Sequence, residues 1–248
     1  MTRRILILGG TGEAVALAER LHSTPGIDVV SSLAGRTRAP NRPQGDMRVG
    51  GFGGAEGLAR YLREARIDAV IDATHPFAAR ISTHAATACD TTAIPYLLLL
   101  RPPWIRQTGD RWAEVDDVSA AADALAATAK RALVTVGRQE LHAFARLRHI
   151  HLVVRLVEPP SEPLPLADCE LIVGRGPFSV ADERQLLTKH RIDTVVSKNS
   201  GGESTRAKIV AARELGLAVV MVRRPAKRAG AVFGSVEDAL KWVSATLA

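Results

Sequence analysis

The chain has 248 residues, of which 46% are hydrophobic, 24% charged and only 4% aromatic, and its formal net charge is +7. This composition excludes an intrinsically disordered chain, and the length allows one large domain or two small ones. No apolar stretch reaches the roughly 18 residues of a membrane span, and the first apolar run is too short for a secretion signal, which predicts a cytoplasmic protein without a membrane partner.

The first hundred residues alternate between apolar strands and amphipathic helices. Ile5–Leu8 is continuously apolar, as in a strand covered on both faces, and Pro76 suits the first turn of a helix. In chain order we expect strand 5–8, helix 13–22, strand 27–33, strand 47–49, helix 55–65, strand 69–72, a helix from Pro76 to Asp90, and strand 94–100.

The second half repeats this alternation. We expect helix 117–128, strand 132–136, helix 140–147, strands 150–154 and 170–173, a helix ending at Lys189, strand 194–197, helix 205–215, strand 218–222 and helix 236–246. The pattern predicts an α/β fold with parallel sheets covered by helices on both faces. Two Rossmann-like doubly wound domains, 1–100 and 101–248, divide at Arg101-Pro102-Pro103. A (β/α)₈ barrel has a similar length, but the glycine-rich turn after the first strand favours the doubly wound arrangement.

That turn, Gly9-Gly10-Thr11-Gly12, is the first candidate site, and Glu13 follows it at the start of the helix. Glycines there let the backbone approach a phosphate while the helix directs its N–H groups and positive dipole at the anion. The turn departs from the G-x-G-x-x-G pattern, because Val15 stands where a third glycine is expected. A tight turn without a ligand is the alternative.

The end of the second strand indicates which dinucleotide binds. An acid there usually holds the ribose of NAD, whereas an arginine accommodates the 2′-phosphate of NADP. The segment Ser32–Arg38 has no acid, and Arg36, assisted by Ser32 or Arg38, is the candidate phosphate ligand. The cofactor is therefore predicted to be NADPH, with a solvated loop arginine as the alternative.

A second turn, Thr74-His75-Pro76, follows the strand at 69–72 and reaches the same edge of the sheet. Thr74 is expected to bind the nicotinamide ribose, and His75 is a candidate general acid. A capping or packing role is the alternative for a histidine with no visible partner, so no catalytic residue is assigned.

Other chemistries lack support in the sequence. The two cysteines are 80 positions apart and no Cys/His cluster has metal-ligand spacing, so neither a disulfide framework nor a metal site is predicted. Hydrolase, zinc-protease and P-loop motifs are missing. Basic residues are spread along the chain rather than gathered in a run, which favours a small, multiply anionic ligand over nucleic acid.

Several segments together resemble the precorrin-6A reductase family of cobalamin biosynthesis over essentially the whole chain. The first-half segments are Ile7-Leu8-Gly9-Gly10-Thr11-Gly12-Glu13-Ala14, Leu33-Ala34-Gly35-Arg36, Gly50-Gly51-Phe52-Gly53-Gly54 and Asp72-Ala73-Thr74-His75-Pro76-Phe77-Ala78. The second-half segments are Val136-Gly137-Arg138-Gln139-Glu140-Leu141, Gly174-Arg175-Gly176-Pro177-Phe178 and Ser197-Lys198-Asn199-Ser200-Gly201-Gly202. Each segment is weak alone, and their order makes the set specific.

The resemblance implies that NADPH transfers hydride to the precorrin-6A macrocycle, giving precorrin-6B. It also implies two Rossmann-like domains that exchange a strand, with cofactor and tetrapyrrole between them, and other enzymes of the pathway as candidate partners. Because precorrins carry many carboxylates, their pocket needs basic donors. The candidates at or near strand ends are Arg101, Arg138, Arg175, Lys198 and Arg206, with Ser200 and Gly201 beside them.

Three alternatives stay open from the sequence. The substrate of the anaerobic route contains cobalt, and no feature of the chain separates it from the metal-free one. A non-catalytic NADP-sensing regulator would not need basic residues at successive strand ends. A nucleic-acid-binding α/β protein would present one continuous basic face.

Overall fold

The computed structural model describes residues 2–35, 43–228 and 230–247, and it divides the chain into two compact units. The first unit contains Met1–Pro102 and Pro225–Ala248, and the second contains Pro103–Arg224. The expected division into 1–100 and 101–248 therefore differs from the structure in its last segment, which returns to the first unit. Arg101 and Pro102 also belong to the first unit.

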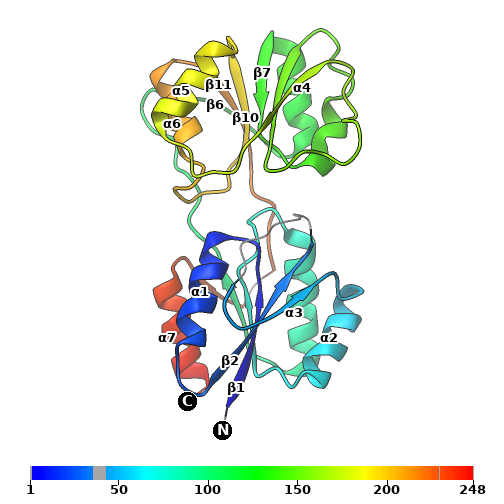
Figure 1. Cartoon of the computed structure of the whole chain (residues 1–248), viewed down its shortest axis with the longest axis vertical. Helices are drawn as coiled ribbons and strands as arrows, with labels where there is room; N and C mark the ends of the chain where they lie inside the picture. Colours follow the sequence, from blue (N-terminus) through cyan, green and yellow to red (C-terminus); the bar gives the residue numbers. More distant parts are fainter. Residues whose placement is uncertain (1, 36–42, 229, 248) are drawn as a thin grey trace. The chain divides into compact units, whose positions relative to one another are not determined.

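The first unit is a six-stranded sheet with the strand order β12-β5-β4-β1-β2-β3, and every pair of neighbouring strands is parallel. Figure 1 shows α1 and α7 covering one face of this sheet and α2 and α3 covering the other. Its elements are β1 (Arg3–Leu8), α1 (Gly12–His22), β2 (Ile27–Leu33), β3 (Asp46–Val49), α2 (Gly54–Glu64), β4 (Ala69–Asp72), α3 (Ala79–Thr92), β5 (Tyr96–Leu99), β12 (Ala231–Phe233) and α7 (Val236–Thr246).

The second unit has a corresponding parallel sheet with the order β6-β11-β10-β7-β8-β9. Its elements are β6 (Arg111–Val115), α4 (Val118–Thr128), β7 (Arg131–Val134), the 3₁₀ helix η1 (Arg138–Phe144), β8 (His151–Leu156), β9 (Cys169–Val173), α5 (Val180–Lys189), β10 (Thr194–Lys198), α6 (Ala207–Glu214) and β11 (Ala218–Val222). Both sheets are thus doubly wound, as predicted.

One edge strand of each sheet, β6 or β12, pairs with a strand that is distant in the sequence. β6 follows β5 in the sequence but pairs with β11, whereas β12 follows β11 and pairs with β5. Neither strand was expected from the sequence. β6 has only one buried residue among five, and β12 has three residues of which none is fully buried, so neither shows the apolar run of a central strand.

Two predicted helices also differ from the structure. The segment expected to be a helix at 140–147 is the 3₁₀ helix Arg138–Phe144. The helix expected to begin at Pro76 begins at Ala79, because a turn closed by the Ala78 N–H donating to the His75 carbonyl oxygen (2.8 Å) occupies the intervening residues.

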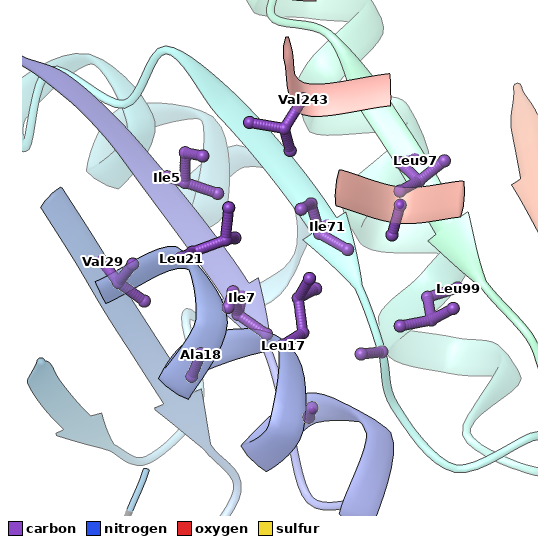
Figure 2. Close-up of a cluster of buried hydrophobic side chains, with 13 residues drawn as sticks. Ile5, Ile7, Leu17, Ala18, Leu21, Val29, Ile71, Leu97, Leu99 and Val243 are labelled. Atoms are coloured by element: carbon purple, nitrogen blue, oxygen red, sulfur yellow. The ribbon is translucent and has the colours of Figure 1, made fainter. Parts of the chain in front are cut away.

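The side chains of β1 alternate between the two layers of the first unit. Ile5 and Ile7 pack with Leu17 and Leu21 of α1 and with Val243 of α7, as Figure 2 shows. Their neighbours on the strand contact α2 and α3 on the opposite face. A strand covered on both faces must be apolar at every position, which explains the continuous apolar run read from the sequence.

Candidate functional site

Each sheet has a switch point, where successive connections leave in opposite directions. It lies between β1 and β4 in the first unit and between β7 and β10 in the second. Ligands of open α/β sheets bind beyond the carboxyl ends of the strands at such points. The turns after these four strands are therefore the places to look for a site.

The turn after β1 combines one tightly packed glycine with two open ones. A side chain at Gly9 would lie 3.3 Å from Leu33 and 3.5 Å from Ala14, whereas nothing within 4 Å faces Gly10 or Gly12. Gly10 has a φ of 113°, a left-handed conformation that favours glycine. Gly9 thus lets α1 pack against the sheet, and the space beside Gly10 and Gly12 can admit a ligand.

Thr11 begins α1 and connects this turn to the next one. Its hydroxyl oxygen accepts from the Ala14 N–H (3.2 Å), which caps the helix, and the hydroxyl donates to the Ala73 carbonyl oxygen after β4 (2.7 Å). Because its one proton is used internally, the Thr11 side chain positions the two turns. The first-turn N–H groups of α1 are the donors offered to an anion.

The turn after β4 is held by a buried carboxylate. Asp72 is fully buried and accepts hydrogen bonds from the N–H and hydroxyl of Thr74 and from the Tyr96 hydroxyl (3.0 Å). Burial, with Asp72 nearby, raises the pKa of Tyr96, so this hydroxyl stays a donor. Lys227, from the segment that returns to the first unit, donates to the Thr74 hydroxyl (3.1 Å). Lys227 was not predicted from the sequence, since 153 positions separate it from Thr74.

His75 and Pro76 complete the same turn. The Phe77 N–H donates to Nδ1 of His75 (3.3 Å), so the neutral imidazole carries its proton on Nε2. Pro76 is buried. His75 thus holds the turn before α3 rather than capping that helix, whose N-cap Ala78 has no side-chain bond, and its role as a general acid stays a prediction.

Glu13 and Arg101 form an ion pair within the first unit. The Arg101 guanidinium lies 2.7 Å from the Glu13 carboxylate, and the two side chains are 15% and 30% exposed. Glu13 stands in the first turn of α1, where an unpaired carboxylate would repel a phosphate. Arg101, predicted as a substrate ligand, therefore also offsets this charge at the nucleotide edge.

The predicted phosphate ligand Arg36, together with Arg38, lies outside the described residues. A different arginine occupies the neighbouring strand end: Arg48 of β3 donates to the Ser32 hydroxyl (2.8 Å) and to the carbonyls of Gly50 and Gly51. Sequence reasoning placed Arg48 in the expected strand 47–49 but gave its side chain no role, because its partners depend on how this strand pairs with β2.

The predicted substrate residues of the second unit follow three of its strands. Lys198 is the last residue of β10, with Ser200 and Gly201 directly after it. Arg138 begins η1 after β7, and Arg175 follows β9. Since all strands of the sheet are parallel, these residues share its carboxyl edge, and Arg206 precedes α6 on the same connection as Lys198.

Most of these cations already contact a carboxylate. Lys198 pairs with Glu140, Arg175 with Glu158 (3.0 Å) and Arg206 with Glu203 (3.0 Å). Arg138 instead donates to the Ser161 hydroxyl (3.0 Å). The second unit thus presents side-chain cations whose charges are partly compensated.

Among the described residues, no group of three or more His, Cys, Asp or Glu side chains could hold a metal ion. In the same part of the chain, no helix is both long and apolar enough to span a membrane.

A doubly wound sheet with an open glycine turn, a capped helix N-terminus and a polar second turn at its switch point defines a Rossmann-type oxidoreductase. The comparisons with known proteins identify the family: the sequence-family model described as "Precorrin-6x reductase CbiJ/CobK" matches residues 4–244. The chain belongs to this family. That membership favours the enzyme over the non-catalytic regulator and the nucleic-acid-binding protein.

The similarity to named relatives extends over almost the whole chain. A precorrin-6A reductase of Rhodococcus erythropolis is 48% identical over 241 residues, covering 97% of each chain. A solved structure of "CobK precorrin-6A reductase" is 43% identical with a TM-score of 0.93, covering 99% of this chain and 97% of that one. A cobalt-precorrin-6A reductase of Priestia megaterium is 30% identical over 245 residues, covering 94% and 95%.

Proposed function

We propose that this protein reduces precorrin-6A to precorrin-6B by hydride transfer from NADPH in cobalamin biosynthesis. The observation that carries the proposal is the match of residues 4–244 to the reductase family, joined to a nucleotide-type turn at the switch point of the first sheet. We place this activity in the cytoplasm, where thiols stay reduced, because Cys89 and Cys169 are both free thiols.

The first unit fits the diphosphate of a dinucleotide. Open space beside Gly10 and Gly12 would admit the phosphates, and the N–H groups at the start of α1 would donate to them. The Thr11–Ala73 hydrogen bond (2.7 Å) holds the second turn beside this position, where Thr74, His75 and Pro76 would adjoin the nicotinamide ribose. When bound, the cofactor supplies the hydride, and these residues orient it.

Arg36 is the proposed ligand of the 2′-phosphate, because no acid follows β2 among residues 34–38 to bind a free ribose hydroxyl pair. Replacing Arg36 with alanine should weaken NADPH binding by about 1.5–3 kcal/mol, the range of a charged hydrogen bond. NADH binding should stay unchanged. Equal losses for the two cofactors, measured by calorimetry, would show that Arg36 does not bind the 2′-phosphate.

The second unit would bind the carboxylates of the tetrapyrrole. Arg138, Arg175, Lys198 and Arg206 lie at its carboxyl edge, and Ser200 and Gly201 add polar groups beside Lys198. Arg101, which belongs to the first unit, is also proposed as a ligand of a substrate carboxylate. Guanidinium groups suit this task because they bind carboxylates in a bidentate manner. The proton that accompanies the hydride has no assigned donor, and His75 is the candidate in this chain.

The test is to mix the purified protein with NADPH and precorrin-6A and to follow absorbance at 340 nm. We expect oxidation of NADPH only when the tetrapyrrole is present, and slower or no oxidation of NADH. If absorbance does not fall, the proposed function is wrong.

The second candidate substrate is cobalt-precorrin-6A. The relative with that name is 30% identical, against 48% for the precorrin-6A reductase, which favours the metal-free substrate. Parallel assays with both tetrapyrroles at equal concentration decide this point. A higher kcat/KM for the cobalt-containing compound would reverse the assignment.

A further inference from the structure

The Arg48 side chain is held by hydrogen bonds at the carboxyl end of strands β2 and β3. It lies directly opposite Ser32 in the parallel register of these strands, and its Nη1 donates to the Ser32 hydroxyl (2.8 Å) and the Gly50 carbonyl (3.2 Å). Its Nη2 donates to the Gly51 carbonyl (3.1 Å). The guanidinium is therefore held in one place by two adjoining segments.

An aromatic ring supports the guanidinium from one side. The Phe52 ring centroid lies 3.7 Å from Cζ of Arg48, and Tyr61 of α2 lies 5.1 Å from it and contacts Phe52. The Phe52 backbone packs closely on α2, where a side chain at Gly57 would come within 1.8 Å of the Phe52 carbonyl oxygen. Phe52 and Tyr61 also pack against the hydrophobic core on this face of the sheet, so the Phe52 ring is held between the core and Arg48.

This arrangement leaves part of the guanidinium for a ligand. Arginine has five N–H donors, and three are used by bonds within the described part of the chain. Arg48 is half-buried rather than enclosed. A planar cation with two donors left and one face covered by an aromatic ring is suited to bind an anion through its edge and a base on its other face.

The position of Arg48 indicates which anion. In a dinucleotide-binding fold, the carboxyl end of β2 adjoins the adenosine ribose, and an arginine nearby accommodates the 2′-phosphate. Gly35, the residue before Arg36, lies against Val49, 3.0 Å from the position of a side chain there. Gly35, at the end of the described part of this loop, therefore lies beside the strand that carries Arg48.

We propose that Arg48, supported by Phe52, is a specificity-determining residue that binds the 2′-phosphate of the adenosine ribose. This proposal rests on the proposed use of NADPH and adds a second cation to the predicted Arg36. Arg48 makes the contact, and Phe52 is a positioning residue that keeps the guanidinium at the strand end.

The experiment compares two ligands that differ only in the 2′-phosphate, 2′,5′-ADP and 5′-AMP, by isothermal titration calorimetry. Arg48→Met should raise the Kd of 2′,5′-ADP at least about tenfold, as for loss of a charged hydrogen bond, and leave that of 5′-AMP within about twofold. Arg63→Met, which removes an exposed cation from α2, is the matched control and should change neither Kd.

The other outcomes overturn the proposal. If Arg48→Met weakens both ligands equally, Arg48 only maintains the loop, and if it weakens neither, Arg48 is not a ligand. Should this variant fail to fold, Phe52→Leu keeps the cation, and a selective several-fold loss for 2′,5′-ADP supports the proposal while an unchanged Kd overturns it. A wild-type protein that binds neither ligand would refute the proposed function itself, whereas normal wild-type binding with an unaffected Arg48 variant refutes only this inference.

Discussion

The two units share one strand order but differ in their first connection after the switch point. In the first unit, β1 leads through an open glycine turn into α1, an eleven-residue helix capped by Thr11. In the second, β7 leads through Gly137 into the seven-residue 3₁₀ helix η1, which has no side-chain cap. A short 3₁₀ helix offers little of the dipole and few of the aligned N–H groups of an α-helix. This difference supports the proposed placement of the diphosphate at the first unit.

The chemistry of the two carboxyl edges differs accordingly. The first unit offers backbone donors and a network of neutral hydroxyls around Asp72. The second offers long cationic side chains, three of which pair with glutamates. Under the proposed function, one fold would carry two kinds of anion site, with rigid backbone donors for phosphate and adaptable side chains for carboxylates.

A buried charge cluster further separates the second unit from the first, and its disruption should have the largest effect. Arg155, Glu183 and Lys208 are 9%, 1% and 4% exposed, and the Arg155 guanidinium lies 2.9 Å from Glu183. Glu183→Ala leaves the buried Arg155 guanidinium without its carboxylate and should lower the free energy of unfolding by about 3–5 kcal/mol.

Urea unfolding followed by tryptophan fluorescence measures this loss, since two of the three tryptophans, Trp104 and Trp112, belong to the second unit. Glu214→Ala, which breaks an exposed pair with Arg184, is the control and should cost less than about 1 kcal/mol. Similar losses for the two variants would mean that the cluster is not electrostatically important.

The next prediction concerns pH. Burial, with Arg155 nearby, lowers the pKa of Lys208 from 10.5 to about 7, and Glu183 opposes this shift. Between those values the unfolded chain binds a proton that the folded chain does not, so this group makes stability rise with pH by at most about 1.4 kcal/mol per unit. Below about pH 7 both states are protonated and the full cost of burying the charge is present.

Lys208→Met should therefore gain most over the wild type below pH 7, and the gain should shrink as the pH rises toward 10. Unfolding curves at several pH values measure the difference. Lys189→Met, at an exposed position of α5, should show no such trend. A constant difference for Lys208→Met would show that the folded protein keeps this lysine at its ordinary pKa.

The central strands and the turns after them could be located from the sequence, but the edge strands β6 and β12 could not, for one physical reason. Central strands are covered on both faces, so Ile5–Leu8 and Ala69–Asp72 are almost continuously apolar and the turns after them could be located. β6 and β12 are edge strands with exposed residues, and their pairing depends on contacts between distant parts of the chain. Lys227 could not be placed at the first unit without that pairing.

Arg48 shows a similar limit at the level of the site. Its neighbours Ser32, Gly50 and Phe52 are close in sequence, yet its role depends on the register of β2 against β3 and on the conformation of Phe52. Glycine content signals a loop but not what the loop holds. The three hydrogen bonds of the Arg48 guanidinium could therefore not be predicted from the sequence.

Helix capping allows a matched comparison of the units with a smaller effect. Thr11→Ala removes the cap of α1 and the bond to Ala73, and Ser179→Ala removes the capping box of α5. Each should cost about 1 kcal/mol of stability. Of these two variants, only Thr11→Ala should also weaken 2′,5′-ADP in calorimetry, by several-fold, because α1 begins at the proposed nucleotide site and α5 belongs to the other unit. Loss of nucleotide binding in Ser179→Ala would contradict the assignment of the two units.

The smallest effect should come from an exposed ion pair of the second unit. Glu203 is 82% exposed and pairs with Arg206, so Glu203→Gln should change the free energy of unfolding by less than about 0.5 kcal/mol. The same substitution frees the Arg206 guanidinium for a carboxylate of the substrate, and the KM for the tetrapyrrole should fall about two- to threefold while the Kd of 2′,5′-ADP stays constant. Glu237→Gln, which frees Arg20 on the first unit, should leave that KM unchanged. A lower KM in both variants would indicate a general effect of net charge, whereas a fall in Glu203→Gln alone would place a substrate carboxylate beside Arg206.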